Sequence, residues 1–370
     1  MSESLPIDKL SRHLLYEDVA ASIRQLIRDR ALWGSYLPPE REMAELLGVN
    51  RGTLRKGLEV LDSQGVIGRR QGRGTLVLSR NGRRGARVLV ASNMRLPARE
   101  TYFAEITTGL TIGASDEAWN VVFHTSLRQP ERWDALLREL ERGELDGAIL
   151  VSLTERSTVE EILRRWKGPA VLVDHHYSDL PLTSVVDDSR GGARAAAEHL
   201  LALGHRRIGY LGVSDPQTNP WRFEGYCQAL RAAGLEADPR LVVPCHASVP
   251  EGRAAAEQLL SLPEPPTAIM AFDDTRAWGA WEAVEARGLA VGRDVAIVGY
   301  GDAAPPAGRA AELSTVHIDP HGMGQAAVEE LNRLISGESA PGKLVELPAE
   351  LVVRGSSREA RPAPAAEGGR

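Results

Sequence analysis

The chain has little cysteine, no long apolar run and no recognisable catalytic motif. Its only cysteines, Cys227 and Cys245, fit neither a disulfide framework nor a metal site. No apolar stretch approaches the ~20 residues that a membrane-spanning helix needs. The N-terminus lacks the basic and then apolar pattern of a signal peptide. These absences predict a soluble, cytoplasmic protein whose thiols stay reduced.

The sequence contains no motif that is typical of an enzyme. There is no nucleophile elbow, Walker loop or zinc motif, and the Ser, His and Asp residues form no recognisable set. The run Asp174-His175-His176 resembles a metal cluster at first sight. Neighbouring strand residues face opposite sides, however, so the two histidines are poorly placed to share one ion. We therefore predict no enzyme, no cofactor and no metal.

Charge is unevenly distributed along the 370 residues, whose net charge is −6. Residues 1–87 hold 16 Lys and Arg against 10 Asp and Glu, whereas the remainder holds 28 against 40. The length indicates two or three domains. A basic head on an acidic body fits a DNA-binding head and a body that does not bind DNA. Random variation of charge between domains would give the same count. Sequence motifs are therefore needed to identify a DNA-binding head.

Residues 37–77 predict a helix, a tight turn, a second helix and a β-hairpin, which together form a winged helix-turn-helix. Pro38 and Pro39 precede the first of these helices, Gly48 ends it in a left-handed conformation, and Asn50 caps the second. An additional helix is expected over residues 14–30. The hairpin tip, residues 68–74, is basic and rich in glycine.

This arrangement predicts contact with DNA. The second helix begins with exposed basic residues, among them Arg51 and Arg55. Arginine pairs with the O6/N7 edge of guanine, and helix N–H groups favour phosphate. The basic tip can lie against a narrow minor groove or the backbone. A solvated helix and loop is the alternative, but the order of the elements favours nucleic acid.

The head resembles the DNA-binding domain of the GntR family of bacterial transcription regulators. The matching residues are Leu37-Pro38, Glu40-Arg41-Glu42, Ala44, Leu47-Gly48-Val49, Arg51, Thr53, Arg55, Leu61, Gly65 and Gln71-Gly72-Arg73-Gly74. The resemblance implies DNA contacts at Arg41, Arg51, Thr53, Arg55, Gln71 and Gly72, to which the basic tip adds Arg73. Gly52 stands where the family has Thr or Ser. Gly57 replaces a common alanine and should weaken its helix.

From Arg87 short apolar runs alternate with helical stretches. Runs that are apolar throughout imply a parallel sheet covered on both faces, and the repeated alternation implies a doubly wound α/β fold of two sheets. The expected strands are 87–92, 121–125, 147–151, 170–174, 208–212, 268–272 and 295–300. The expected helices are 105–118, 132–141, 159–166, 192–203, 222–233, 251–262 and 276–287.

Residues 87–357 resemble the effector-binding domain of the LacI/GalR family, whose fold is shared with periplasmic sugar-binding proteins. The anchors include Gly191-Gly192, Leu203-Gly204-His205-Arg206, Gly225-Tyr226, Ala271-Phe272-Asp273-Asp274, Val298-Gly299-Tyr300 and Leu351-Val352-Val353-Arg354. The resemblance implies two lobes, with lobe one at 87–186 and 317–347 and lobe two at 187–316 and 348–358. The remaining expected parts are the head at 10–78, a linker at 79–86 and a disordered tail at 359–370.

Ligands of open α/β sheets lie beyond the carboxyl ends of the strands. Asp174 ends an expected strand, Asp273 and Asp302 follow expected strands, and Trp221 and Arg222 lie where a loop enters a helix. Carboxylates, an arginine and aromatic rings suit a sugar. The LacI/GalR resemblance implies effector contacts at Tyr102, Phe103, Asp174, Arg222, Asp273 and Gly301-Asp302. Alternatively, Asp273 and Asp302 cap the helices that follow them.

Two residues depart from the LacI/GalR pattern. Gly301 replaces a common carboxylate, and His175 replaces a common arginine. Both changes indicate an effector that differs from those of the best-known members.

The function predicted is a sequence-specific DNA-binding transcription regulator that acts as a repressor. A homodimer would bind a near-palindromic operator, and a sugar-like effector between the lobes would control this binding. Resemblance to arabinose-responsive hybrid repressors covers both domains and favours a pentose or hexose that releases the operator. A nucleoside effector is the alternative. Two other classes of function, an enzyme and an exported sugar carrier, are less favoured.

Overall fold

The computed structural model describes residues 16–29, 32, 35–63, 66–70, 74–77, 86–92, 100–125, 129–142, 144–212 and 220–358. The chain divides into two compact units. The first comprises residues 1–95, 108–185 and 324–344, and the second comprises 96–107, 186–323 and 345–370. The expected tail and all of the expected linker except Ala86 lie outside the described residues. The domain limits expected from the sequence therefore stay predictions.

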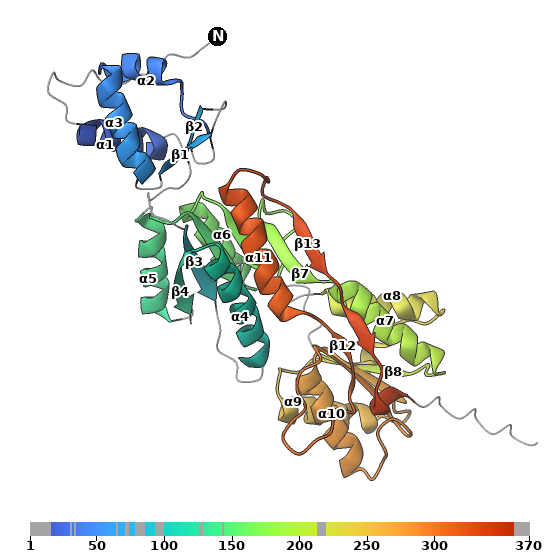
Figure 1. The fold of residues 1–370 in the computed structure, drawn as a ribbon. Coiled ribbons are helices and arrows are strands. Elements are labelled where there is room, and N and C mark those ends of the chain that lie inside the picture. Colours follow the sequence, from blue (N-terminus) through green and yellow to red (C-terminus); the bar gives the residue numbers. More distant parts are fainter. Residues whose placement is uncertain are drawn as a thin grey trace, which may run out of the picture. The chain divides into compact units, whose positions relative to one another are not determined.

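In the described part of the head there are three helices and a hairpin (Figure 1). The helices are α1 (Tyr16–Asp29), α2 (Glu40–Leu47) and α3 (Arg51–Ser63), and the antiparallel strands are β1 (Ile67–Arg70) and β2 (Gly74–Val77). Apolar side chains of all three helices and both strands form one buried core, in which Ile23, Leu47 and Leu58 are central members. The N–H of Leu37 donates to the carbonyl of Thr75 at 2.8 Å, so the segment before α2 is fixed to the hairpin.

Two glycines and one asparagine determine how the helices of the head end, begin and pack. Gly48 has φ +65° and caps α2, and Asn50 Oδ1 accepts the N–H of Thr53 at 2.8 Å, so both caps are confirmed. Gly57 has a packing role that the sequence did not predict. A Cβ at this position would lie 2.9 Å from Val19 Cγ1, so the glycine allows α1 and α3 to pack closely.

One six-stranded sheet of the body has the order β13-β7-β6-β5-β3-β4, and its strands β3 to β6 lie in the first unit. Its strands are β3 (Arg87–Ser92), β4 (Asn120–Thr125), β5 (Gly147–Val151), β6 (Ala170–Val173), β7 (Thr183–Asp187) and β13 (Leu344–Leu347). The pairs β4–β3, β3–β5, β5–β6 and β6–β7 are parallel. Helices α5 (Pro130–Glu141) and α6 (Arg156–Arg165) lie in the first unit, whereas α4 (Glu100–Asp116) and α11 (Pro320–Ile335) each begin in the second unit and end in the first. Every residue of β5 is buried, as expected for a central strand covered on both faces.

The second unit contains a six-stranded sheet in the order β14-β12-β11-β10-β8-β9. Its strands are β8 (Ile208–Leu211), β9 (Val242–Val243), β10 (Ala268–Ala271), β11 (Ala296–Tyr300), β12 (Ser314–His317) and β14 (Glu350–Val352). Only β14 runs antiparallel to its neighbour. Alternate strand residues face two cores. Tyr210 and Met270 pack with α7 (Ser189–Ala202) and α8 (Trp221–Ala232), whereas Leu211 and Ile269 pack with α9 (Val249–Leu260) and α10 (Asp274–Ala286).

The doubly wound α/β prediction is confirmed, but five strands and one helix were not expected from the sequence. Strands β9, β13 and β14 are short and partly exposed, so they lack the continuous apolar signal. Helix α11 contains Gly322 and Gly324, which obscure its helical pattern. Among the described residues of the second unit there are also two 3-10 turns, η2 (Pro239–Leu241) and η3 (Gly355–Ser357).

Candidate DNA interface and effector site

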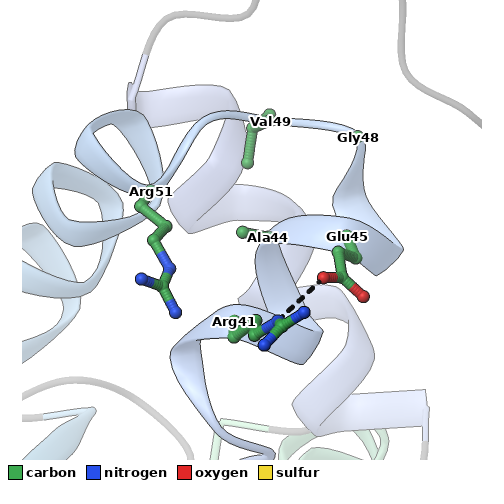
Figure 2. A pocket seen from close by; sticks show the side chains of 6 residues that line it. All are labelled: Arg41, Ala44, Glu45, Gly48, Val49 and Arg51. Carbon is green, nitrogen blue, oxygen red and sulfur yellow. Dashed lines mark hydrogen bonds and ion pairs between the residues drawn. The ribbon is translucent and has the colours of Figure 1, made fainter.

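Two exposed arginines lie beside the turn between α2 and α3. Arg51 is the first residue of α3, and the Arg41 side chain on α2 is 78% exposed. Both line an open hollow of about 480 Å³, together with Ala44, Glu45, Gly48 and Val49 (Figure 2). The positive end of α3 and two guanidinium groups therefore meet at one place, which suits an anion such as phosphate.

Two of the expected DNA-contacting arginines are held by carboxylates through their Nε atoms. Arg41 Nε donates to Glu45 Oε1 at 3.2 Å, as Figure 2 shows. Arg55 Nε donates to Glu40 Oε2 at 2.9 Å, and this hydrogen bond is the main cause of a raised pKa of Arg55. No ion pair joins Arg51 to another described residue. Its guanidinium is therefore open to a ligand.

Of the other expected DNA contacts, the structure describes Thr53 but not the residues of the hairpin tip. The N–H of Thr53 is used in the cap of α3, while its side chain is half-buried on the first turn. Gln71, Gly72 and Arg73 lie outside the described residues.

In the second unit, Arg222 occupies the carboxyl edge of the sheet. It is 6% exposed, and its Cζ lies 3.7 Å from the centre of the Tyr300 ring and 4.7 Å from that of Phe272. Nη1 donates to the carbonyl of Phe272 at 2.9 Å, and Nη2 lies 3.8 Å from Oδ1 of Asp187. The guanidinium is thus fixed between two aromatic rings at the end of β10 and β11.

Asp187 and Tyr300 belong to the same cluster, although the sequence did not mark them as site residues. The hydroxyl groups of Tyr300 and Ser189 both donate to Asp187 Oδ2, the latter at 2.7 Å. Burial raises the pKa of Tyr300 well above its usual value. The position of Asp187 at the carboxyl end of β7 was the available signal, by the same rule that selected Asp273 and Asp302.

The carboxylates after β10 and β11 play different roles. Asp273 Oδ1 accepts the N–H of Arg276 at 3.0 Å, and the two side chains form an ion pair, so the expectation of a helix cap is confirmed. Asp302 does not cap a helix. Its Oδ1 accepts from Arg354 at 2.7 Å and its Oδ2 contacts His317 Nδ1 at 3.1 Å.

Asp274 is buried behind this edge. Its carboxyl group accepts hydrogen bonds from Thr315 Oγ1 at 2.6 Å and from the N–H of Ala303 at 2.7 Å, and burial raises its pKa to about 6. The neighbouring Gly301 has φ +121°, a conformation that side-chain-bearing residues rarely adopt. The backbone conformation at position 301 therefore favours glycine over the carboxylate residue of the LacI/GalR pattern.

Three further expected effector contacts lie in the second unit. Tyr102 and Phe103 of α4 pack edge to face at 5.5 Å between ring centres. Phe103 is buried, and Tyr102 packs against the core formed by α7 and α8. Trp221 begins α8 and lies 5.8 Å from Arg190 Cζ. The second unit thus holds six of the seven expected effector residues, and Asp174 belongs to the first.

In the first unit, Asp174 follows β6 with φ +66° and accepts the hydroxyl of Ser152 at 2.5 Å. Ser152 follows β5 and has φ +51°. Two adjacent strands therefore end in left-handed non-glycine residues, a strain of ~1–3 kcal/mol each that is typical of functional sites. Burial lowers the pKa of His175, whereas His176 contacts Ser184. No group of residues in the described part of the chain is arranged to hold a metal ion.

The fold and these two sites define a DNA-binding head joined to a ligand-binding α/β body. Residues 15–77 match the model of bacterial regulatory proteins of the gntR family, and residues 197–357 match a periplasmic binding protein-like domain. The regulator DegA of Bacillus subtilis is 30% identical over 281 residues, which cover 73% of this chain and 80% of DegA. The repressor CytR of Escherichia coli is 28% identical over 270 residues, covering 70% and 76% of the two chains.

A solved structure of a regulator in complex with cellobiose, CelR, has a TM-score of 0.66 and 26% identity, covering 86% of this chain and all of CelR. The chain belongs to the LacI-type family of HTH transcription regulators, with a head of the GntR type. It is a DNA-binding transcription regulator with an effector-binding body, and its relatives are regulators rather than enzymes. In the part of the chain that the structure describes, no helix is long and apolar enough to cross a membrane.

Proposed function

We propose that this regulator is a repressor that binds its operator through α3 and the hairpin tip. The open guanidinium of Arg51 at the N-terminus of α3 is the observation that carries the proposal. The proposal places contacts from Arg41 and Arg51 to phosphates and base edges at the hollow between α2 and α3. Thr53 and Arg55 follow along the same helix, and Gln71, Gly72 and Arg73 contact the DNA from the tip.

The effector proposed is a small sugar bound by the body. The carboxylates of Asp174, Asp273 and Asp302 offer acceptors for hydroxyl groups, and Arg222 offers a fixed donor. Trp221, Tyr102 and Phe103 supply aromatic surface for the apolar C–H face of a sugar ring. The complex of the related CelR with cellobiose supports this class of ligand. Binding of the sugar releases the operator, with a coupling free energy of ~1–3 kcal/mol.

A homodimer is the proposed assembly, because two heads are needed to read a near-palindromic operator. Two features of the first unit support a dimer interface there. β4 is an edge strand, and its Phe123 side chain is 46% exposed. Ile112 on α4 is 43% exposed. Exposed large apolar side chains on an edge strand are unfavourable unless a partner covers them.

Two measurements on the purified chain test the proposal. Selection from a library of random DNA duplexes should enrich one near-palindromic sequence. Thermal melting with a panel of monosaccharides, disaccharides, sugar phosphates and nucleosides should then identify an effector, because a ligand at 100 times its Kd stabilises the protein by ~2.7 kcal/mol. The sugar that raises the melting temperature should release the selected duplex. Stabilisation by nucleosides alone would make a nucleoside the effector in place of a sugar. A selection that enriches no DNA sequence would refute the proposed operator binding.

A further inference from the structure

Glu40, the first residue of α2, lies against α3. Its Oε2 accepts a hydrogen bond from Arg55 Nε at 2.9 Å, across 15 positions of sequence. The Arg55 side chain is 60% exposed and that of Glu40 is 31% exposed. The pair therefore joins the two helices at the surface that carries the expected DNA contacts, and not inside the core.

The geometry of this pair leaves the outer edge of the guanidinium open. Only Nε of Arg55 donates to Glu40, and neither Nη atom donates to another described residue. Two parallel donors are what the O6 and N7 atoms of guanine require. A guanidinium that is held through Nε can present its two Nη groups in a fixed plane, and less side-chain freedom is then lost on binding.

We propose that Glu40 is a positioning residue that fixes Arg55 for base recognition and so sets the sequence specificity of the head. The inference rests on the proposed role of α3 in reading the operator. This role of Glu40 has a consequence that is unusual for a residue beside DNA. The carboxylate repels phosphates and therefore lowers the affinity for arbitrary DNA, while it favours one arginine geometry. Removing its charge should strengthen binding to arbitrary DNA and weaken discrimination between sequences.

The test compares Glu40→Gln with the matched control Glu59→Gln. Glu59 is an exposed residue of α3 that acts on Arg55 through its charge alone, without a hydrogen bond between them. The probes are the duplex that the wild-type chain selects from a random library and a scrambled duplex of the same composition. Each variant is titrated with both probes over a range of salt concentrations.

Glu40→Gln should lower the ratio of affinities for the selected and scrambled duplexes about tenfold, the value of one bidentate base contact. The salt dependence on the scrambled duplex should steepen by about one released ion, because the freed Arg55 reaches a phosphate. Glu59→Gln should keep the ratio of the wild type. In an Arg55→Ala background, Glu40→Gln should no longer change the ratio.

Three results would overturn the inference. The first is an unchanged ratio in Glu40→Gln. The second is an equal fall of the ratio in Glu59→Gln, which would mean that charge alone matters. The third is an equal loss of affinity for both duplexes with a lower melting temperature, which would mean that Glu40 only stabilises the head. A wild-type chain that selects no duplex would instead refute the proposed function, and the role of Glu40 with it.

Discussion

The guanidinium of Arg222 lies 3.7 Å from the centre of the Tyr300 ring, and the hydroxyl of that ring donates to the buried carboxylate of Asp187. Arg222 comes from the start of α8, Tyr300 from the end of β11 and Asp187 from the end of β7. A desolvated cation–π contact is worth ~2 kcal/mol, and a buried carboxylate needs its donors and a nearby cation. The arginine is therefore both a proposed ligand contact and a counter-ion.

Arg222→Met should abolish release of the operator by the effector while leaving binding to the selected duplex intact. The variant should also lose about 3 kcal/mol of stability, because Asp187 is left buried without its cation. Gel-shift titrations with and without the effector, together with urea unfolding, measure both effects. Arg231→Met is the control, since Arg231 lies exposed on the same helix. Normal release by Arg222→Met would remove Arg222 from the effector site.

Asp274→Asn should change how stability depends on pH. The folded-state pKa of Asp274 is about 6, above its ordinary value of 3.8, so the folded chain binds this proton more tightly than the unfolded chain. This contribution to stability is present below about pH 4 and is lost as the pH rises through 6. The loss is about 3 kcal/mol at 1.36 kcal/mol per pKa unit.

The difference in unfolding free energy between Asp274→Asn and the wild type should therefore shift in favour of the variant between pH 4 and 6. Urea titrations at several pH values measure this difference, in which the other titrating groups cancel. Asp294→Asn is the control. The hydrogen bond with Arg293 lowers the pKa of Asp294 below its ordinary value of 3.8, so its contribution is lost only at lower pH and its difference should stay constant between pH 4 and 6. A constant difference for Asp274→Asn across this range would contradict the prediction.

The local signals of the sequence were sufficient for the elements of the head and for seven strands and seven helices of the body. Gly48 and Asn50 act on the residues next to them, so their roles could be predicted from neighbours alone. The cluster around Asp187 could not, because Tyr300 is 113 positions away and only the folded sheet brings the two together. Asp302 illustrates the same limit. A helix cap was possible from the sequence, but its partners Arg354 and His317 come from distant segments.

Gly57→Ala should destabilise the head, although alanine favours helices. The new Cβ would lie 2.9 Å from Val19 Cγ1 and 3.2 Å from the carbonyl of Tyr16, so α1 and α3 would have to separate. Overpacking of this kind costs ~1–3 kcal/mol, more than the ~1 kcal/mol gained in helix propensity. Thermal melting should show a lower midpoint for Gly57→Ala, and Val19→Ala should lower the midpoint less in the Gly57→Ala background than in the wild type, because the two side chains compete for the same space. A higher midpoint for the single variant would mean that propensity outweighs packing.

Arg51→Ala should abolish specific operator binding and leave effector affinity unchanged. Arg51 lines the hollow at the start of α3, and no carboxylate among the described residues holds it. Loss of one bidentate contact to a base costs ~1–3 kcal/mol, and loss of a phosphate contact lowers the affinity further. Titrations with the selected and scrambled duplexes measure the change. Equal binding of the selected duplex by the variant and the wild type would exclude α3 as the recognition helix.

Phe123→Lys should convert the proposed dimer to a monomer. Phe123 is 46% exposed on the edge strand β4, and a charge placed in an apolar interface must be desolvated without a partner. Separation of the two heads removes the avidity of a bivalent site, so affinity for the selected duplex should fall at least ~100-fold. Sedimentation equilibrium and gel-shift titrations measure the two effects. Leu289→Lys, an exposed apolar residue of the second unit, is the control and should stay dimeric. A dimeric Phe123→Lys variant with full operator affinity would place the interface elsewhere on the chain.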